Sequence, residues 1–452
     1  MTTYSDAVTA LYALGQELAK PRKFELGEMR TLMDALGNPQ RRLQCVLVGG
    51  TNGKGSTSAT LAAISQAAGY KTALYTSPHL LKVNERIRID GEAISDAEFA
   101  EMYIRVDDAA RKLVAAGKLP QHPSFFEMLT AMAFEYFASS RVELAVLEVG
   151  MGGRLDATNV VDPCISIITD IALDHQQYLG DTVAKITAEK AGILRKDGVL
   201  VTLPQHPEAN DVIGKVATEL GTRAVSAVQY VPNVSPGAVK YDQLRPTAAH
   251  IANFLRNRYF LEVMGEELLI ETPLIGRHQL RNVALAIAAA EQLNECGFTI
   301  TAKHVANGVR DTHWPGRFQL LQATVARPDV VLDVAHNPAG AWALRSALSE
   351  HFDGRPVTFV FGAMKDKAIG EMAEILFPLA EHVVVTHAHT ERAAEPQEIM
   401  EVAARTGADL HAEQDVRSAM ERAIVLSPKN GVIVVTGSIY VVGEALAMLQ
   451  PE

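Results

Sequence analysis

Short runs of β-branched residues recur along this chain, and each is followed by a glycine-containing turn and an alanine-rich amphipathic stretch. The clearest example is Cys45–Gly49, which precedes a helical pattern over residues 56–68. Similar runs occur at residues 142–149, 164–169, 199–203, 330–334, 357–361, 382–386 and 432–436. Uninterrupted apolar strands that alternate with helices form mainly parallel sheets covered on both faces, so we predict an α/β fold. Ligands bind such sheets beyond the carboxyl ends of the strands, where functional residues are therefore expected.

A change of domain is predicted near residue 300. A long helical pattern that begins at Gln279 ends near Cys296, and Trp314-Pro315-Gly316-Arg317 precedes a second strand–helix series. Pro-Gly pairs mark turns and hinges. We therefore predict a first domain over residues 1–297, a linker over 298–315 and a smaller second domain over 316–452.

Residues 205–275 fit the strand–helix alternation worst. Within them, residues 259–263 and 267–271 flank Met264-Gly265-Glu266 and are predicted to pair as a hairpin. We detect no internal repeat or low-complexity tract.

The charge balance narrows the class of function. The 452 residues include 53 acidic and 42 Lys or Arg residues, a net charge of -11. Nonspecific nucleic-acid and membrane-surface binders are normally basic, so neither partner is expected. The sequence also has no unbroken apolar window of about 18 residues and no secretory signal at its start. Cys45, Cys164 and Cys296 form no CxxC pair and indicate buried free thiols, so we expect a reducing, cytoplasmic location.

Residues 49–57 read Gly-Gly-Thr-Asn-Gly-Lys-Gly-Ser-Thr, between a predicted strand and a predicted helix. Glycines let backbone N–H groups face an anion, and the helix N-terminus and Lys54 add positive charge. The segment departs from G-x-x-x-x-G-K-[ST], because Val48 replaces the first glycine and Gly55 separates Lys54 from Ser56. A phosphate site is favoured over a glycine-rich turn with an incidental lysine. The displaced hydroxyl leaves open whether Ser56 binds magnesium and suggests that the metal is held elsewhere.

This variant loop resembles that of the Mur ligase superfamily, particularly the folylpolyglutamate synthases and dihydrofolate synthases of the bifunctional bacterial type. Further segments match the family in the same order, at residues 76–80, 148–159, 173–175 with 179–180, 189–193, 314–317, 333–338 and 437–438. The resemblance spans nearly the whole chain and is weakest at 205–275. It implies an N-terminal P-loop ATPase-like domain that binds ATP and pterin, and a C-terminal Rossmann-like glutamate-ligase domain.

The resemblance also implies an activity. It is the ATP-dependent ligation of L-glutamate to dihydropteroate and to tetrahydrofolate or its polyglutamates, in folate biosynthesis. A carboxylate is a poor electrophile and must first be phosphorylated, which requires positioning and neutralisation of charge. The implied partners are therefore these small molecules, with no nucleic acid or membrane, and we expect a monomer.

The resemblance assigns roles to individual residues. A carboxylate on a buried strand is costly without a partner, which favours metal binding by Glu148 over a capping role, whereas His175 and Lys190 take their roles only from the family. The implied metal site holds two Mg²⁺ ions, and Lys190 is carbamylated in the family. Metal ligands are Ser77, Glu148, His175 and Lys190; ATP contacts are Gly53, Lys54, Gly55, Ser56, Asn282, Arg317 and Asp333; catalytic residues are Lys54, His175, Lys190 and His336.

Pterin contacts are implied by three segments. They are Gly27, Glu28, Met29 and Arg30, then Phe125, Phe126 and Glu127, then Leu155, Asp156 and Ala157. The first begins at Phe24, and its Gly-Glu-Met-Arg order departs from the commoner Gly-Leu-Glu-Arg. Aromatic rings can stack on a pterin, but Phe125 or Phe126 can equally be helix core. His336 is expected near the incoming glutamate, and Arg317 is expected to reach the nucleotide phosphates when the domains close.

Other interpretations remain open. A peptidoglycan-type Mur ligase needs a uridine-binding domain before the phosphate loop, and only about 48 residues precede it here. A regulatory P-loop switch hydrolyses ATP without needing glutamate, whereas a ligase needs both carboxylate and amine acceptors. The dependence of ADP release on glutamate therefore distinguishes a switch from a ligase. A catalytically inactive relative is disfavoured by the intact set of predicted site residues. His387 and His389 are expected on a loop at the rim of the active site rather than in a transition-metal site.

Overall fold

The structure is a computed structural model that describes residues 2–15, 26–232 and 255–450. The chain divides into two compact units. The first comprises Met1–Pro236, Arg258–Glu271 and Arg281–Thr312, and the second comprises Gly237–Asn257, Thr272–Leu280 and His313–Glu452. In the described residues no helix is long and apolar enough to cross a membrane.

The first unit is built on a sheet with the strand order β4-β3-β2-β5-β1-β6-β7-β8. All neighbours from β2 to β8 pair in parallel, while β3 and β4 extend one edge antiparallel. β1 is buried along its whole length, as its apolar sequence predicts. The bounds are β1 Cys45–Gly49, β2 Thr72–Tyr75, β3 Ile87–Ile89, β4 Glu92–Ala93, β5 Leu144–Glu148, β6 Ile165–Ile168, β7 Val199–Thr202 and β8 Arg223–Ser226.

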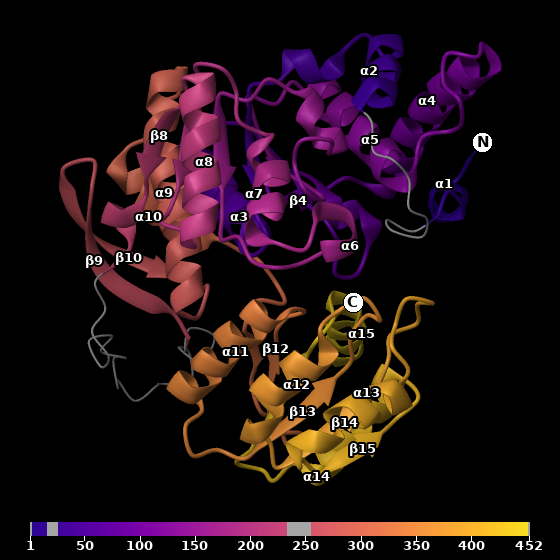
Figure 1. The fold of residues 1–452 in the computed structure, drawn as a ribbon, viewed down its shortest axis with the longest axis vertical. Coiled ribbons are helices and arrows are strands. Elements are labelled where there is room, and N and C mark those ends of the chain that lie inside the picture. The colour runs from indigo at the N-terminus through magenta and orange to yellow at the C-terminus, as the bar shows by residue number, and fades with distance from the viewer. Residues whose placement is uncertain (1, 16–25, 233–254, 451–452) are drawn as a thin grey trace. The chain divides into compact units, whose positions relative to one another are not determined.

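Helices cover this sheet. α3 packs on β1, β2 and β5, and Figure 1 shows α1, α2, α4 and α5 gathered together, where they contact one another. The helices are α1 Tyr4–Ala13, α2 Leu26–Ala35, α3 Lys54–Ala67, α4 Asp96–Ala115, α5 Phe125–Ser139, α6 Gln176–Leu179, α7 Val183–Ala191, α8 Pro207–Leu220, α9 Arg277–Leu293 and α10 Ala302–Asp311. Single 3₁₀ turns are η1 Pro39–Arg42, η2 Val83–Arg86, η3 Ala157–Val160, η4 Val228–Tyr230 and η6 Asn294–Cys296.

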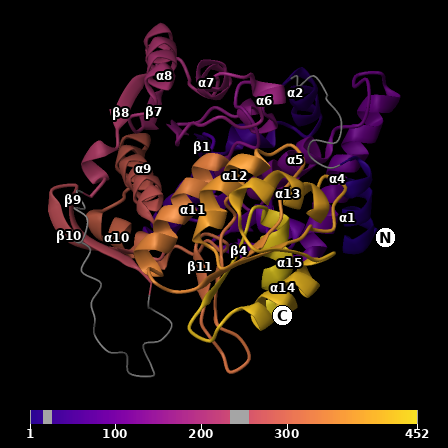
Figure 2. The ribbon, with the colours of Figure 1, turned by 60° about the horizontal axis from the view of Figure 1, so that its bottom comes forward.

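The second unit has a smaller sheet with the order β11-β12-β16-β13-β14-β15, parallel except at β11. Figure 2 shows α11, α12 and α13 side by side, and α14 beside α15. The strands are β11 Gln319–Leu321, β12 Asp329–Leu332, β13 Val357–Phe361, β14 His382–Val385, β15 Leu410–Ala412 and β16 Val432–Thr436. The helices are α11 Pro338–His351, α12 Ile369–Leu376, η7 Phe377–Leu379, α13 Pro396–Ala403, η8 Ala404–Thr406, α14 Val416–Leu426 and α15 Ile439–Leu449. The predicted α/β architecture with mainly parallel sheets is confirmed.

The division into two compact units differs from the division predicted from the sequence. Much of the predicted linker 298–315 forms α10, which packs on α3 so closely that a Cβ at Gly308 would lie 2.3 Å from Ile64 Cα. α10 therefore belongs to the first unit, and the chain enters the second unit at His313. The second unit also takes residues 272–280 from the predicted first domain.

The region that fits the pattern worst is partly regular. α8 and β8 continue the strand–helix alternation, and the predicted hairpin is present as β9 Asn257–Val263 and β10 Glu266–Thr272. Met264 and Gly265 between them both have positive φ, as a type I′ turn requires. Residues 233–254 of this region lie outside the described residues.

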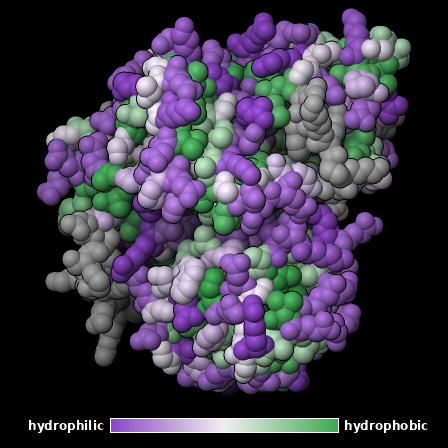
Figure 3. Space-filling model, in the orientation of Figure 1, coloured by the Kyte–Doolittle hydropathy of each residue, from purple (hydrophilic) through white to green (hydrophobic). Residues whose placement is uncertain are grey.

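The surface carries no single dominant apolar area in the face that Figure 3 shows, where hydrophilic residues predominate and apolar ones form small separate groups. Scattered exposed apolar side chains of this kind are normal for folded proteins. The three cysteines are free thiols, as predicted, but only Cys45 is buried, whereas Cys164 and Cys296 are half-buried.

Candidate active site

The glycine-rich loop joins β1 to α3 in a conformation that only glycine fits at two positions. Gly50 has φ +146 and a Cβ there would lie 1.8 Å from Thr169 Oγ1, while Gly53 has φ +90 and a Cβ there would lie 2.1 Å from Asn282 Oδ1. α3 begins directly after Gly53, so its unpaired N–H groups and positive dipole end meet the loop. Gly55 and Ser56 are buried in the first turn. The arrangement is a cradle for a phosphate group.

Two lysines bond to one carbonyl of this loop. Lys54 Nζ donates to Gly50 O at 3.2 Å and to Thr51 O at 3.1 Å. Lys190, at the end of α7, is 4% exposed and donates from Nζ to Gly50 O at 2.7 Å. Burial, followed by the charge of Lys54, lowers the pKa of Lys190 to about 7. An appreciable fraction of Lys190 is therefore the uncharged amine at neutral pH.

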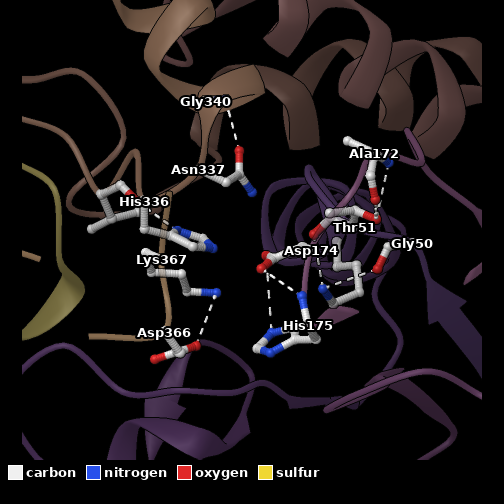
Figure 4. A network of polar contacts seen from close by, with 12 residues as sticks. Gly50, Thr51, Ala172, Asp174, His175, His336, Asn337, Gly340, Asp366 and Lys367 are labelled. Atoms are coloured by element: carbon white, nitrogen blue, oxygen red, sulfur yellow. Dashed lines mark hydrogen bonds and ion pairs between the residues drawn. The ribbon is translucent and has the colours of Figure 1, made fainter. Parts of the chain in front are cut away.

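The loop is fixed by the segment after β6. Thr51 N and Asn52 N both donate to Asp170 O, and Thr51 Oγ1 exchanges hydrogen bonds with the backbone of Ala172 (Figure 4). The Asp170 carboxylate in turn receives Arg281 Nη2 at 2.6 Å. This ion pair anchors α9 beside the loop. Sequence reasoning missed both members of the pair, although an acid directly after a buried strand is the signal that could have found Asp170.

Asn282 follows Arg281 on α9 and is buried against the loop. Its side chain lies beside Gly53, and its carbonyl accepts from Thr57 Oγ1 at 3.4 Å. The structure thus brings a predicted nucleotide contact to the N-terminus of α3, across a sequence separation of 225 residues.

Three of the predicted metal ligands lie at or after the ends of the strands β2, β5 and β6 of the first sheet. Glu148 ends β5, pairs in register with Val48 and is 5% exposed. Ser77 follows β2 and donates its N–H to Glu148 Oε2 at 3.2 Å. His175 is the N-cap residue of α6, after β6, and its backbone N–H donates to Asp174 Oδ1 at 2.9 Å (Figure 4). Since β2, β5, β1 and β6 are adjacent and parallel, these residues share the carboxyl edge of the sheet with the loop.

The predicted pterin segments fall into contrasting environments. Phe125 is core, stacked on Tyr12 at 5.4 Å, whereas Phe126 lies against Gly150, where a Cβ would meet its ring at 2.5 Å. Phe126 is therefore the aromatic ring nearer the strand end that carries Glu148. The Glu127 carboxylate accepts from Ser124 N and Oγ in a capping box at the start of α5.

Asp156 is the buried acid of the third segment. It accepts from Met151 N at 2.9 Å and from Thr158 N and Oγ1 at 3.0 and 2.6 Å. Burial raises its pKa, against the effect of these hydrogen bonds. Its neighbours Leu155 and Ala157 are half-buried and buried respectively.

The first segment forms the start of α2. Met29 packs into the core of the first unit, so its side chain supports the helix, whereas Gly27 and Arg30 are exposed and Glu28 is half-buried. Phe24, which begins the predicted segment, lies outside the described residues.

In the second unit the predicted residues cluster after β12. Asp333 is 8% exposed and accepts from Phe318 N and Ala335 N, both at 2.9 Å. Burial raises its pKa, while the charge of Arg317 acts in the opposite direction. Arg317 also lies over the Trp314 ring, 5.9 Å from its centroid. His336 Nδ1 lies 2.9 Å from Val334 O, just before the Asn337 cap of α11 (Figure 4).

Comparisons with known proteins agree with this geometry. Residues 48–290 match the Mur ligase middle domain, and residues 316–439 match the Mur ligase, glutamate ligase domain. The Bacillus subtilis dihydrofolate synthase/folylpolyglutamate synthase is 32% identical over 446 residues, 98% of each chain. A Haloferax volcanii protein named probable bifunctional folylpolyglutamate synthase/dihydropteroate synthase is 35% identical over 450 residues; the chain spans 50% of its length.

A solved structure is also similar along the whole chain. Mycobacterium tuberculosis folylpolyglutamate synthase, complexed with ADP and AMPPCP, has a TM-score of 0.82 at 31% identity and covers 99% of this chain and 100% of its own. The chain belongs to the Mur ligase family, within its group of folylpolyglutamate synthases and dihydrofolate synthases.

Proposed function

We propose that this chain is an ATP-dependent ligase that joins L-glutamate to dihydropteroate and to tetrahydrofolate or its polyglutamates. It would thus act as both dihydrofolate synthase and folylpolyglutamate synthase. The observation that carries the proposal is the shared strand edge of the first unit, where a phosphate cradle, the buried Glu148 carboxylate and the buried Lys190 amine meet. The names of similar proteins support the choice of substrates.

The proposed chemistry has two steps. The substrate carboxylate attacks the γ-phosphorus of ATP, ADP leaves, and an acyl phosphate forms. The glutamate amine then attacks the acyl carbon, and phosphate leaves with the former carboxylate oxygen. In the first step the loop N–H groups and Lys54 hold the phosphates and offset their charge. Asn282, Asp333 and Arg317 are proposed to hold the nucleotide, and His336 the glutamate.

Magnesium fits the donor set. A carboxylate buried at a strand end, with the Ser77 backbone bonded to it, offers the oxygen that Mg²⁺ prefers. Glu148, Ser77 and His175 would hold the ion, which supplies neutralising charge at the phosphoryl group. Phe126 and Asp156, with Leu155, Ala157 and the exposed part of α2, are proposed to hold the pterin.

We further propose that Lys190 is carbamylated. Lys190 and Lys54 direct two amino groups at the single carbonyl of Gly50, and conversion of the Lys190 amine to a carbamate places a negative charge beside Lys54. The uncharged amine adds to CO₂ and releases one proton, so a neutral group becomes an anionic carbamate. The product supplies carboxylate oxygens suited to a second Mg²⁺.

Replacing Lys190 by alanine should abolish most turnover and leave space for a small carboxylate. We expect acetate or formate to restore part of the glutamate-dependent ADP release. Lys196→Ala, at an exposed lysine on the following loop, is the matched control and should be insensitive to acetate. The mass of native Lys190 enzyme should exceed the sequence mass by one CO₂. Active enzyme of unmodified mass, with no rescue of the variant, would exclude carbamylation.

Arg317→Ala is expected to lower turnover by on the order of 100-fold while changing unfolding free energy by less than about 1 kcal/mol. The guanidinium is proposed to contact the nucleotide phosphates, and its ring contact with Trp314 contributes little to the fold. Arg310→Ala removes an exposed arginine paired with Asp311 and serves as the control. Unchanged turnover in Arg317→Ala would contradict the assignment.

The overall proposal is tested by ADP release with ATP, Mg²⁺ and glutamate, adding dihydropteroate or tetrahydrofolate in turn. Release with both acceptors supports both activities, and release with one assigns a single activity. Glutamate-independent ATP hydrolysis would instead indicate a P-loop switch, and dependence on neither pterin another ligase. The monomeric state and the cytoplasmic location remain predictions.

A further inference from the structure

Two histidines and an aspartate of the second unit lie together outside the proposed ligase residues. His382 Nδ1 is 2.7 Å from Asp409 Oδ2, and His411 Nε2 is 3.0 Å from the same oxygen. The ligand atoms of all three lie within 4.8 Å of one another, and it is the one group of this kind among the residues the structure describes. The histidines are half-buried and Asp409 is exposed.

The register of β14 and β15 produces this cluster. Val383 pairs with Leu410, and Val384 pairs with His411. Because side chains alternate along a strand, His382, Asp409 and His411 share one face, while Val383 points into the core on the other. β15 is the edge strand of the sheet, and the exposed fractions of the three side chains, 57% for Asp409, 28% for His382 and 23% for His411, show that solvent reaches the cluster.

The cluster lies away from the proposed glutamate and nucleotide residues of the same unit. His382 begins β14 at its amino end, whereas Asp333 and His336 follow the carboxyl end of β12. The strands β12, β16, β13, β14 and β15 are parallel. The cluster therefore lies at the amino ends of these strands, and Asp333 and His336 lie at the carboxyl ends.

The donor set is that of a transition metal rather than magnesium. Two imidazole nitrogens and one carboxylate oxygen suit Zn²⁺, Co²⁺ or Ni²⁺, whereas Mg²⁺ prefers oxygen alone. The Asp409 carboxylate lies within hydrogen-bonding distance of both imidazole rings, so the three donor groups already face one another.

We propose that His382, Asp409 and His411 form a binding site for a divalent transition metal, with Zn²⁺ as the preferred ion and water as a further ligand. Tetrahedral ligands about 2.0–2.1 Å from zinc lie roughly 3.4 Å apart. The present N–O distances of 2.7 and 3.0 Å must therefore widen by about half an ångström. The ion takes the place of the hydrogen bonds between the ring nitrogens and Asp409, and each neutral imidazole then carries its proton on the other ring nitrogen. Zinc then ties the edge strand β15 to β14.

The experiment titrates the whole protein with Co²⁺ and Zn²⁺ in excess Mg²⁺, so that magnesium competes for the oxygen-rich ligase site. We expect one equivalent of Co²⁺ to give a visible d–d absorption band, and Zn²⁺ to raise the Tm by a few degrees. His411→Gln and Asp409→Asn should each weaken binding at least tenfold and remove the Tm rise. His206→Gln, at an exposed histidine of the first unit, should change neither.

Glutamate-dependent ADP release should be unchanged in His411→Gln and Asp409→Asn, which verifies that both variants fold. Binding that is equally tight in these variants would place the ion elsewhere and overturn the proposal. Absence of micromolar binding to the native protein would also overturn it and leave the three side chains as a hydrogen-bonded group only.

Discussion

Gly53→Ala is expected to lower kcat/KM by on the order of 100-fold or more while leaving the fold intact. The new methyl group would lie 2.1 Å from Asn282 Oδ1, so either the loop or α9 must move. A shift of about 1 Å in a group that positions a reacting phosphate is sufficient for a loss of this size. The affinity for ATP, measured by calorimetry, should fall in parallel with ADP release.

Gly69→Ala is a closely matched control. Gly69 has φ +89 against +90 for Gly53, but a Cβ there would meet nothing within 4 Å. Both variants carry the same backbone strain of about 1–2 kcal/mol, and only Gly53→Ala adds the collision. Gly69→Ala should therefore lose stability and keep turnover. Equal turnover in the two variants would show that the Gly53–Asn282 contact does not position the loop.

The second large effect is expected for Glu148→Gln, which keeps the shape of the side chain and removes its charge. Turnover should fall by on the order of 100- to 1,000-fold, and the Mg²⁺ concentration for half-maximal rate should rise. Stability should be unchanged or higher, because a buried carboxylate is replaced by a neutral amide that still accepts from Ser77 N. Thermal unfolding and a Mg²⁺ titration of ADP release measure the two effects.

Glu135→Gln is the control that separates the effect of removing a buried charge from the effect of removing a metal ligand. Glu135, on α5, is a second buried glutamate of the first unit. Its Oε1 lies 2.8 Å from Nη1 of Arg105, on α4. Its replacement should lower stability by no more than about 1 kcal/mol, because Arg105 is exposed, and should leave the Mg²⁺ requirement unchanged. A Glu148→Gln enzyme with the magnesium response of Glu135→Gln would contradict metal binding by Glu148.

Much of the fold follows from local sequence pattern, because short runs of β-branched residues such as 432–436, bounded by turn residues, favour buried strands. The short edge strands β3 and β4 carry too few residues for any periodicity and were not predicted. α10 was placed in a linker, because its contact with α3 depends on Gly308 meeting a helix about 240 residues earlier in the chain. Sequence pattern cannot show such a partner.

The placement of candidate residues at the carboxyl ends of strands was predictable where a motif adjoins a strand, as at Gly53, Lys54 and Glu148. It was not predictable where tertiary packing decides the environment. Met29 was grouped with substrate contacts, but the spacing that makes α2 amphipathic places it in the core. Phe125 and Phe126 are neighbours in sequence, and only the packed helix shows which ring faces Gly150.

The large sequence separation between Asn282 and the loop that it contacts has a consequence for synthesis of the protein on the ribosome. The strands β1, β5 and β6 and the helix α9 that together shape the nucleotide loop emerge from the ribosome at widely separated times, since the contact of Thr57 with Asn282 closes 225 residues of chain. A nascent chain that ends before α9 contains Lys54 and the glycines of the loop but lacks Asn282, against which Gly53 packs. Competence to hold a nucleotide should thus arise late in translation, after most of the first unit has been made.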